Sequence, residues 1–303
     1  MDRASRLSAD QLEKYGYRKS RIIDHNLDHA SLETRCPLDN GRHTGRWKHR
    51  AGRLDRLPLE LITQVLLSLD LPSLTTFRRV NRRAMALVDS LRQYSMLFRH
   101  CPNILRAILS MEAKHFDCAF LFQTVSTTKC ASCDRVGDHL YLITCKRVCY
   151  DCYSSDPLYF PASATLVTRK TGVPRKSLKA LPHVRSLPGR YTAFDKIARG
   201  RVMLLDRQSL RDRTTTTGSS AQTLDEALEQ CDLKTTEPRR YMSIISAPFF
   251  DSSGLSADWG FYCLLCLDDT EPSTYFRNKY TEDGFAEHLA RYGLNHGLQR
   301  SRE

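Results

Sequence analysis

The chain has 303 residues, of which 41% are hydrophobic, and it carries a formal net charge of +12. This length allows two domains with a sizeable core, while the modest apolar fraction indicates that part of the chain is not packed. Residues 1–20 lack the apolar core of a signal peptide, and no run approaches the ~18 apolar residues of a membrane span. We therefore expect a soluble protein of the cytoplasm, the nucleus or both, where paired cysteines more often hold metal than form disulfides.

Residues 1–52 carry scattered charge and few apolar clusters, and they run into the basic stretch GRHTGRWKHRAGR. We expect this segment to be flexible. Its basic side chains could serve as a nuclear-import signal or a phosphate-binding arm, but such runs are more often solvated linkers.

The stretch from Leu57 to Leu91 predicts two or three short amphipathic helices. The residues of the first that recur at three- and four-residue spacing are Leu61, Ile62, Val65, Leu66 and Leu69. Such a stripe is typical of a helix buried along one side. Ser73 is the expected N-cap of a second helical region. A unit of roughly forty residues seldom supplies its own core, so we infer that a partner or the rest of the chain completes it.

This stretch resembles an F-box. The match rests on Leu57-Pro58, Glu60-Leu61, Val65-Leu66, Leu69, Asp70-Leu71-Pro72, Leu74, Val80, Arg82-Arg83 and Leu87-Val88. The resemblance implies that residues 53–100 dock on the Skp adaptor subunit of a cullin-RING ubiquitin ligase. The residues expected to carry docking are Leu57, Pro58, Leu61, Val65, Leu69, Leu74, Phe77 and Val80. The alternative is an ordinary helical hairpin within the protein's own core.

Four arginines recur within this stretch, at Arg78, Arg79, Arg82 and Arg83. Like charges at this spacing disfavour an isolated helix by a few tenths of a kcal/mol per pair. We hypothesise that an acidic surface of the adaptor faces part of this cluster; a solvated face is the alternative. Beyond the cluster, residues 102–125 predict two further helices, the second capped by Asp117, which fix the orientation of the F-box relative to the middle of the chain.

Residues 129–153 contain two Cys-x-x-Cys pairs, Cys130/Cys133 and Cys149/Cys152. Each pair aims two thiolates at one point, and two pairs give the tetrahedral set that zinc accepts. The strand-like residues between them predict a zinc-ribbon-like hairpin. Because four protein thiolates leave no open position, we expect a structural zinc. Cys145 is either a substitute ligand for Cys149 or a buried spare thiol.

The nearby cations Lys129, Arg135, Lys146 and Arg147 are expected to compensate the thiolate charge. Residues 201–240 are expected to form a mobile linker with helix candidates at 202–211 and 224–233. Residues 241–303 are expected to pack on the middle domain, beginning with a strand at 241–245.

A second metal position is suggested by Cys263, Cys266 and His288. The sequence does not assign a fourth ligand to this position. Tyr292 is a poor zinc ligand, and His296 is the remaining candidate. Buried cysteines beside a helix are the alternative.

The ordered set CASCDRVGDHLYLITCKRVCYDC, RSLPGRYT, WGFYCLLC and YTEDGFAEHLARYG resembles a group of fungal F-box proteins with a cysteine-rich middle. The expected fold is α+β, with a helical F-box followed by a mixed, mainly irregular domain built on the zinc-ribbon-like hairpin.

The expected function is that of a non-catalytic substrate adaptor in an SCF-type ligase, with a cullin and a protein substrate as further partners. A zinc-ribbon protein that binds nucleic acid is the alternative and predicts binding that weakens steeply with salt. A RING ligase or cysteine hydrolase fits less well, since only one complete zinc set is present and no Cys/His/Asp order stands out.

Overall fold

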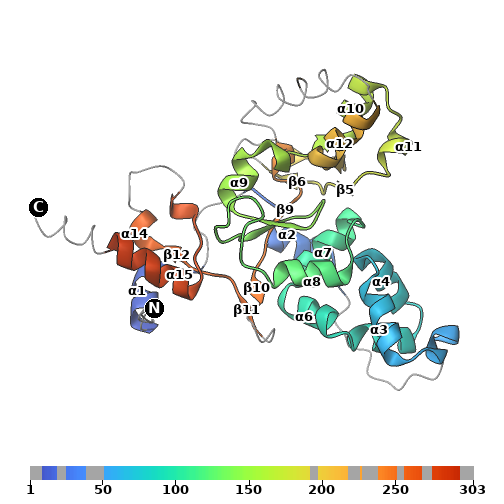
Figure 1. The fold of residues 1–303 in the computed structure, drawn as a ribbon, viewed down its shortest axis with the longest axis horizontal. Coiled ribbons are helices and arrows are strands. Elements are labelled where there is room, and N and C mark those ends of the chain that lie inside the picture. Colours follow the sequence, from blue (N-terminus) through green and yellow to red (C-terminus); the bar gives the residue numbers. More distant parts are fainter. Residues whose placement is uncertain are drawn as a thin grey trace, which may run out of the picture.

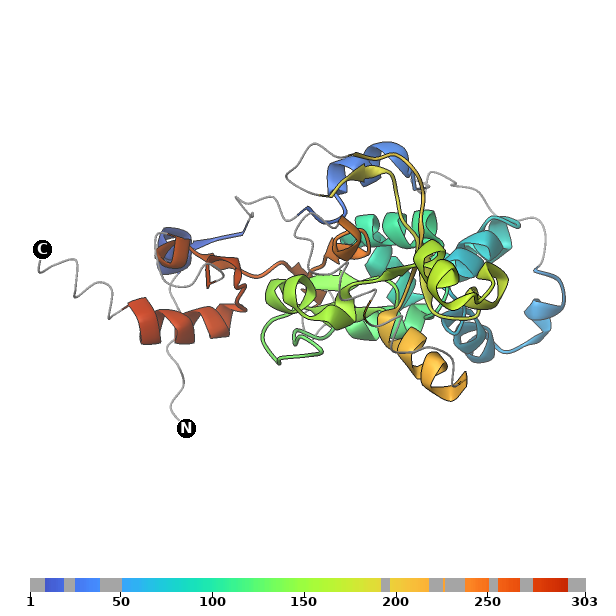
Figure 2. The same ribbon diagram turned by 90° about the horizontal axis from the view of Figure 1, so that it is seen from above.

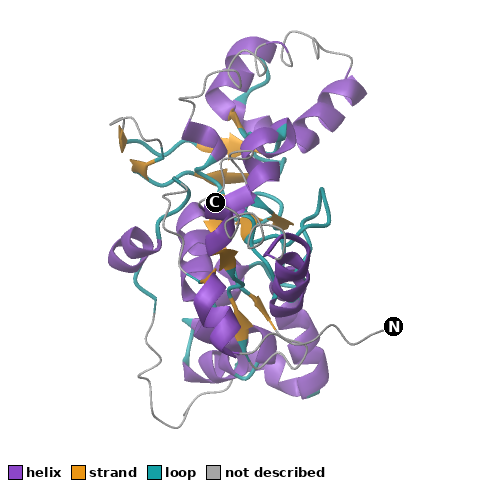
Figure 3. Ribbon diagram, turned by 90° about the vertical axis from the view of Figure 1, so that its left-hand side faces the viewer, coloured by secondary structure: helices purple, strands orange, loops and turns teal. Residues whose placement is uncertain are grey.

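The computed structural model describes residues 9–18, 25–38, 51–191, 197–217, 226, 238–250, 256–267 and 275–293. Helices make up most of its regular structure, and its strands are short (Figure 3). The chain forms a helical end, a central sheet and two smaller lobes (Figure 1). The mixture of helices with small antiparallel sheets agrees with the predicted α+β class.

The helical end contains the F-box-like stretch. Its elements are the short 3-10 helix η1 (Gly52–Arg56), α3 (Leu59–Leu67), α4 (Leu71–Arg78), α5 (Arg82–Asp89), α6 (Arg92–His100), α7 (Pro102–Met111) and α8 (Cys118–Val125). The side chains of Asp70, Asn81 and Asp117 cap α4, α5 and α8 by accepting backbone N–H groups. Asp117 was the predicted cap. Ser73 was not a cap: its N–H donates to Asp70 at 2.9 Å, because α4 begins three residues earlier than the sequence suggested.

The N-terminal segment differs from the expected flexible linker. It contains α1 (Ala9–Tyr15), the two-residue strand β1 (Gly16–Tyr17) and α2 (His29–Arg35). Leu27 and Leu32 are buried in the main core, and the Leu27 N–H donates to Ile244 O at 2.9 Å. Two leucines five residues apart are too weak a pattern to predict this packing from sequence. Residues 1–8, 19–24 and 39–50 lie outside the described residues.

The central sheet has the strand order β3-β2-β9. Its strands are β2 (His139–Tyr141), β3 (Lys146–Val148) and β9 (Ile244–Ser246). The hairpin β2–β3 was predicted, and β9 overlaps the predicted strand at 241–245 but begins three residues later and ends one residue later. Leu140 faces Ile245 across the β2–β9 pair, so a strand from the C-terminal region completes the sheet of the middle region. The short helices α9 (Tyr150–Ser155) and η2 (Pro157–Tyr159) follow the hairpin.

The upper lobe in Figure 1 is built on a second sheet with the order β4-β8-β5. Its elements are β4 (Ala162–Ser163), α10 (Ala164–Thr171), α11 (Arg175–Leu178), β5 (His183–Arg185), β8 (Met203–Leu205) and α12 (Arg207–Thr217). The strand β8 is fully buried, so residues 203–205 form part of a core and not of the predicted mobile linker. The helix predicted at 202–211 instead begins at Arg207, and the one predicted at 224–233 lies outside the described residues.

Two of the three two-stranded sheets among the described residues lie near the central sheet in sequence. They pair β6 (Gly189–Arg190) with β7 (Ile197–Ala198), and β10 (Phe249–Phe250) with β11 (Ala257–Asp258). The 3-10 helix η3 (Pro238–Arg240) precedes β9.

The second lobe joins the two ends of the chain, because β1 pairs with β12. Its C-terminal elements are β12 (Tyr262–Cys263), α14 (Leu264–Leu267), η4 (Tyr275–Arg277), α15 (Glu282–His288) and the π-helix η5 (Leu289–Gly293). Figure 2 shows this lobe extending from one side of the molecule. Lys279 reaches back from it, with its Nζ 4.0 Å from Asp138 Oδ2 beside the central sheet.

Candidate docking face and metal centres

The helical end presents large apolar side chains to solvent. Among the described residues the exposed large hydrophobics are Leu57 (41%), Leu59 (56%), Leu61 (46%), Val65 (46%), Val80 (66%), Phe120 (46%) and Ile197 (56%). Five of these seven lie between residues 57 and 80. Leu61 and Val65 are one turn apart on α3, so they share a face. An apolar group of this kind on the surface is typical of an interaction site.

The structure divides the predicted docking residues into three groups. Leu57, Pro58, Leu61, Val65 and Val80 are exposed, whereas Leu69 and Phe77 are half-buried against the core. Leu74 is fully buried at 0% exposure, so it supports the face from beneath and cannot contact a partner there. Leu59 is also exposed, but it was not among the predicted docking residues. It does not belong to the four-residue repeat of Leu61, Val65 and Leu69 on which that prediction was based.

Two of the four clustered arginines are engaged within the helical end. The Arg78 guanidinium donates two bonds to Asp89, from Nε at 2.7 Å and from Nη2 at 3.0 Å, and is buried. Arg83 Nε donates to Asp55 at 2.9 Å. Only Arg79 and Arg82 are exposed. If an acidic surface of the adaptor faces this cluster, it would therefore contact Arg79 and Arg82 and not Arg78 or Arg83.

The four predicted cysteines come together at one point. The Sγ atoms of Cys130, Cys133, Cys149 and Cys152 all lie within 4.8 Å of one another. Cys130 and Cys133 lie on a turn closed by the bridge between Lys129 and Val136, while Cys149 and Cys152 lie at the start of α9. The hairpin β2–β3 connects the two pairs and sets their separation.

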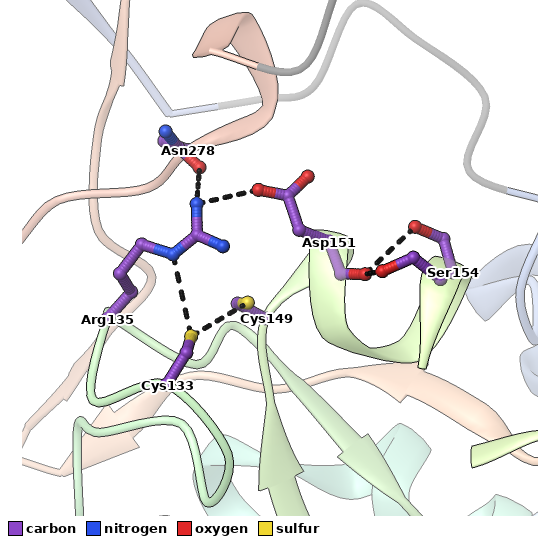
Figure 4. A network of polar contacts seen from close by, with 7 residues as sticks. Cys133, Arg135, Cys149, Asp151, Ser154 and Asn278 are labelled. Carbon is purple, nitrogen blue, oxygen red and sulfur yellow. Dashed lines mark hydrogen bonds and ion pairs between the residues drawn. The ribbon is translucent and has the colours of Figure 1, made fainter. Parts of the chain in front are cut away.

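Two N–H groups donate to these sulfurs, and Figure 4 shows one of them, from Arg135 to Cys133. The Ser132 N–H donates to Cys130 Sγ at 3.5 Å, and Arg135 Nε donates to Cys133 Sγ at 3.5 Å. Arg135 is in turn held by Asp151, with its Nη1 2.7 Å from Oδ2. Donors at sulfur stabilise thiolate charge, so Arg135 has the compensating role that the sequence predicted for it.

The chemistry of this donor set fits a zinc ion. A hydrogen bond from the Cys149 thiol lowers the pKa of Cys130 to about 4, whereas burial raises the pKa of Cys152 to about 12. Thiolates packed this closely repel one another, so ionising more than one member of such a group is unfavourable without a cation. A cation that accepts four thiolates removes this conflict, and four soft ligands in two Cys-x-x-Cys turns are the structural zinc arrangement.

Cys145 lies outside this group of four. It is 1% exposed and occupies the turn between β2 and β3 with a φ of 53°. Burial raises its pKa to about 12. These features agree with the expectation of a buried spare thiol.

Arg147 has a different role from the predicted charge compensation. Its guanidinium is buried and donates to four backbone carbonyls, those of Thr124 (3.1 Å), Val125 (3.1 Å), Gly137 (2.6 Å) and Pro248 (2.6 Å). Two of these carbonyls end α8, where helix carbonyls lack intrahelical partners. Burial lowers the pKa of Arg147 to about 10. Arg147 thus fastens the hairpin to the helical end, a link with no sequence signal.

The second predicted cluster is also assembled, but with three members. The ligand atoms of Cys263, Cys266 and His288 lie within 4.8 Å of one another, with Cys266 Sγ 3.3 Å from His288 Nε2. The His288 ring stacks on Tyr280 at 4.3 Å between centroids. A hydrogen bond from Cys266 lowers the pKa of Cys263 to about 4. The side chains of Tyr292 and His296 lie outside the described residues.

Comparison with known proteins gives one match. The F-box domain profile matches residues 54–96, which cover α3, α4, α5 and the start of α6. No curated protein and no solved structure matches the chain. Within the described residues, every helix is too short or too polar to cross a membrane. The chain therefore contains an F-box domain, and such domains generally bind Skp1 in SCF complexes.

Proposed function

We propose that this protein is a substrate-recognition subunit of an SCF-type cullin-RING ubiquitin ligase. Its F-box would dock on the Skp adaptor subunit, which in turn joins the cullin, and the remainder of the chain would hold a protein substrate. The observation that carries the proposal is the exposed apolar group at residues 57–80 within the matched F-box. Desolvating such side chains favours association.

The proposed role needs no catalytic residue in this chain. Ubiquitin transfer would occur on other subunits, and the contribution of this protein would be proximity between substrate and charged enzyme. Rigidity supports that role. Two of the four bonds from Arg147 join the hairpin to α8, and the main core runs from α3 through the central sheet without a break. A substrate held on this body would keep one orientation relative to the adaptor.

The cysteine clusters would hold the substrate-binding body in shape. We propose that Cys130, Cys133, Cys149 and Cys152 bind one structural zinc. The group at Cys263, Cys266 and His288 is proposed as a second, weaker metal position, since it supplies three ligands where zinc takes four. Placement among fungal F-box proteins with a cysteine-rich middle, and in the cytoplasm or nucleus, belongs to the same proposal.

Co-purification tests the proposal. The full chain should carry the Skp adaptor and a cullin with it, and a Leu57→Ala, Pro58→Ala double variant should lose both while remaining folded. The matched control is Ile197→Ala, which removes an apolar side chain that is also exposed (56%, against 41% for Leu57) but lies far from the F-box in sequence, and it should retain both partners. Recovery of DNA or RNA in place of the adaptor would overturn the proposal in favour of a nucleic-acid-binding protein.

A further inference from the structure

A short segment of the chain lies between the two groups of candidate metal ligands. The first cluster is Cys130, Cys133, Cys149 and Cys152, and the second cluster is Cys263, Cys266 and His288. Residues 277–280, here called the linking segment, end η4 and lead into α15, the helix that carries His288. Side chains of this segment contact residues beside both clusters, so a change at one cluster can reach the other through it.

The lobe around the second cluster has little core of its own. Among the described residues its apolar core consists of Phe261, Cys263 and Phe285, and this core is separate from the main one. A core of this size seldom fixes a structure unaided. The positions of the three ligand side chains therefore depend on contacts between this lobe and the rest of the molecule.

The first two residues of the linking segment contact the surroundings of the first cluster. The Arg277 guanidinium lies over the ring of Tyr150, with its Cζ 3.9 Å from the ring centroid, and Tyr150 stands between the two cysteines of the second Cys-x-x-Cys pair. Asn278 Oδ1 accepts a hydrogen bond from Arg135 Nη1 at 3.5 Å (Figure 4). Arg135 is the residue whose Nε donates to Cys133 Sγ. Both contacts therefore depend on residues whose positions the first cluster sets.

Lys279 holds the linking segment on the central sheet. Its side chain is 5% exposed, and its Nζ lies 4.0 Å from Asp138 Oδ2. The Asp138 carboxylate also contacts His139 Nδ1 at 2.7 Å, at the start of β2. The same Nζ lies 5.0 Å from the ring centroid of Tyr262, the residue before Cys263. Because charges buried this deeply are costly to separate, Lys279 fixes the segment between the sheet and the lobe.

Tyr280 connects the linking segment to the second cluster. Its ring stacks on that of His288, with 4.3 Å between centroids and an interplanar angle of 20°. Its backbone exchanges two hydrogen bonds of 2.9 Å with Phe261, two residues before Cys263. Gly260 has a φ of 68°, and a Cβ there would lie 2.9 Å from Tyr280 O, so this close approach requires glycine. Tyr280 thus orients one ligand and lies beside the strand that carries another.

We propose that the linking segment couples the two clusters, so that zinc at the first cluster strengthens zinc binding at the second. The inference rests on the metal binding proposed above and not on docking to the adaptor. Convergence of the four sulfurs fixes Arg135 and Tyr150, and the segment packed against them holds Tyr280 on the His288 ring. A ligand that is already oriented loses less entropy when the metal binds. By reciprocity, zinc at the second cluster strengthens binding at the first by the same factor.

Zinc titrations of the full chain test the coupling. The double variant Arg277→Ala, Asn278→Leu removes both contacts with the first cluster, and it should bind zinc at the second cluster at least about tenfold more weakly than the wild type, within the usual range for coupled sites. The matched double variant Arg277→Lys, Asn278→Asp keeps a cation over Tyr150 and an oxygen acceptor for Arg135, so it should retain the wild-type affinity. Competition with a chelator gives the affinities, and cobalt(II) spectra distinguish the four-sulfur site from the sulfur–nitrogen site. Hydrogen exchange in α15 at saturating zinc should match the wild type in both variants.

Reciprocity supplies a second test from the opposite end of the linking segment. Cys266→Ser removes a ligand of the second cluster and none of the first. At zinc concentrations that fill both clusters of the wild type, this variant should bind zinc at the first cluster more weakly by the same factor, at least about tenfold. Cys36→Ser, at a half-buried cysteine outside both clusters, is the control and should leave this affinity unchanged.

The outcomes separate this inference from the proposals on which it rests. Equal affinity of the second cluster in the wild type and in Arg277→Ala, Asn278→Leu would overturn the coupling alone, as would an unchanged first cluster in Cys266→Ser. Loss of α15 protection at saturating zinc in the first variant would also overturn it, by showing that the segment is needed for folding. A wild-type chain that binds a single zinc would overturn the second metal position as well. Adaptor co-purification tests the proposed function independently of these results.

Discussion

The helical end and the cysteine-centred middle region reach stability by different routes. The helical end packs whole rows of aliphatic side chains, and Leu74, Leu97 and Ile108 are each fully buried. The strands of the middle region are only three residues long, and they are held by four converging sulfurs and one buried arginine. A leucine core can leave an apolar face uncovered, whereas the middle region would depend on the metal that its four cysteines are proposed to bind.

The largest effect should come from removing two metal ligands. A Cys130→Ser, Cys133→Ser variant should lose its zinc and unfold the middle region, because zinc binding contributes on the order of 10 kcal/mol in comparable sites. The helical end should still bind the Skp adaptor, which would sharpen the contrast between the regions. Elemental analysis and hydrogen exchange give the two readouts, with Cys145→Ser as the control that keeps its zinc. A wild-type preparation that contains no metal and still has a folded middle region would contradict the claim that the two regions are stabilised differently.

Within the helical end, buried and exposed leucines should behave oppositely. Leu74→Ala should lower the free energy of unfolding by about 2–5 kcal/mol, because it leaves a cavity in the core. Leu61→Ala, at an exposed position, should change it by less than about 0.5 kcal/mol yet weaken adaptor binding. Chemical denaturation and adaptor titration measure the two quantities. Equal destabilisation by both variants would show that the face is not free.

Arg147 tests the link between the two regions. Arg147→Met should lower the free energy of unfolding by about 3 kcal/mol, because the buried carbonyls of Val125, Gly137 and Pro248 lose the guanidinium that donates to them. The neighbouring exposed Lys146 provides the matched control as Lys146→Met, which should leave the unfolding midpoint unchanged. Equal unfolding midpoints for Arg147→Met and Lys146→Met would show that Arg147 does not stabilise the link between the two regions.

The smallest expected effect concerns pH and the N-terminal helix. Burial lowers the pKa of His29, against the opposing influence of Asp28 and Glu33, and His139 lowers it further. The neutral ring is therefore favoured when α2 is docked, with its Nε2 3.0 Å from Ser246 Oγ. Because the folded pKa lies below the ordinary value, stability falls as pH drops from about 6.5 through the folded pKa. The protection of α2 amides, taken relative to the intrinsic exchange rate at each pH, should fall between pH 7.5 and 6.0 in the wild type and change less in His29→Gln. Unchanged protection in the wild type would contradict this assignment.

The sequence predicted what local spacing controls. Each Cys-x-x-Cys pair occupies one turn, and the fifteen residues between Cys133 and Cys149 are enough for only a short hairpin, so their convergence followed from spacing. The F-box stretch was recognisable because its helical period and its order of apolar residues are both local. The burial of Leu74 was not predicted, since the helical period alone does not say which side of α4 faces the core.

Long-range contacts had no such signal. Strand β9 joins β2 across more than one hundred residues, and Arg35 meets Pro188 across a sequence separation of 153. Nothing near Arg147 in sequence indicates that it caps α8. Residues 277–279 reach the surroundings of the first cysteine cluster only through such contacts, which is why only the structure showed this link.

The central claim is that the apolar face at residues 57–80 is completed by another protein. Hydrogen exchange of the zinc-loaded full chain, with and without the Skp adaptor, tests it directly. The account predicts strong added protection confined to η1, α3 and the α4–α5 junction, with the central sheet unchanged. Adaptor binding that leaves exchange in α3 unaltered, or no binding at all, would contradict it.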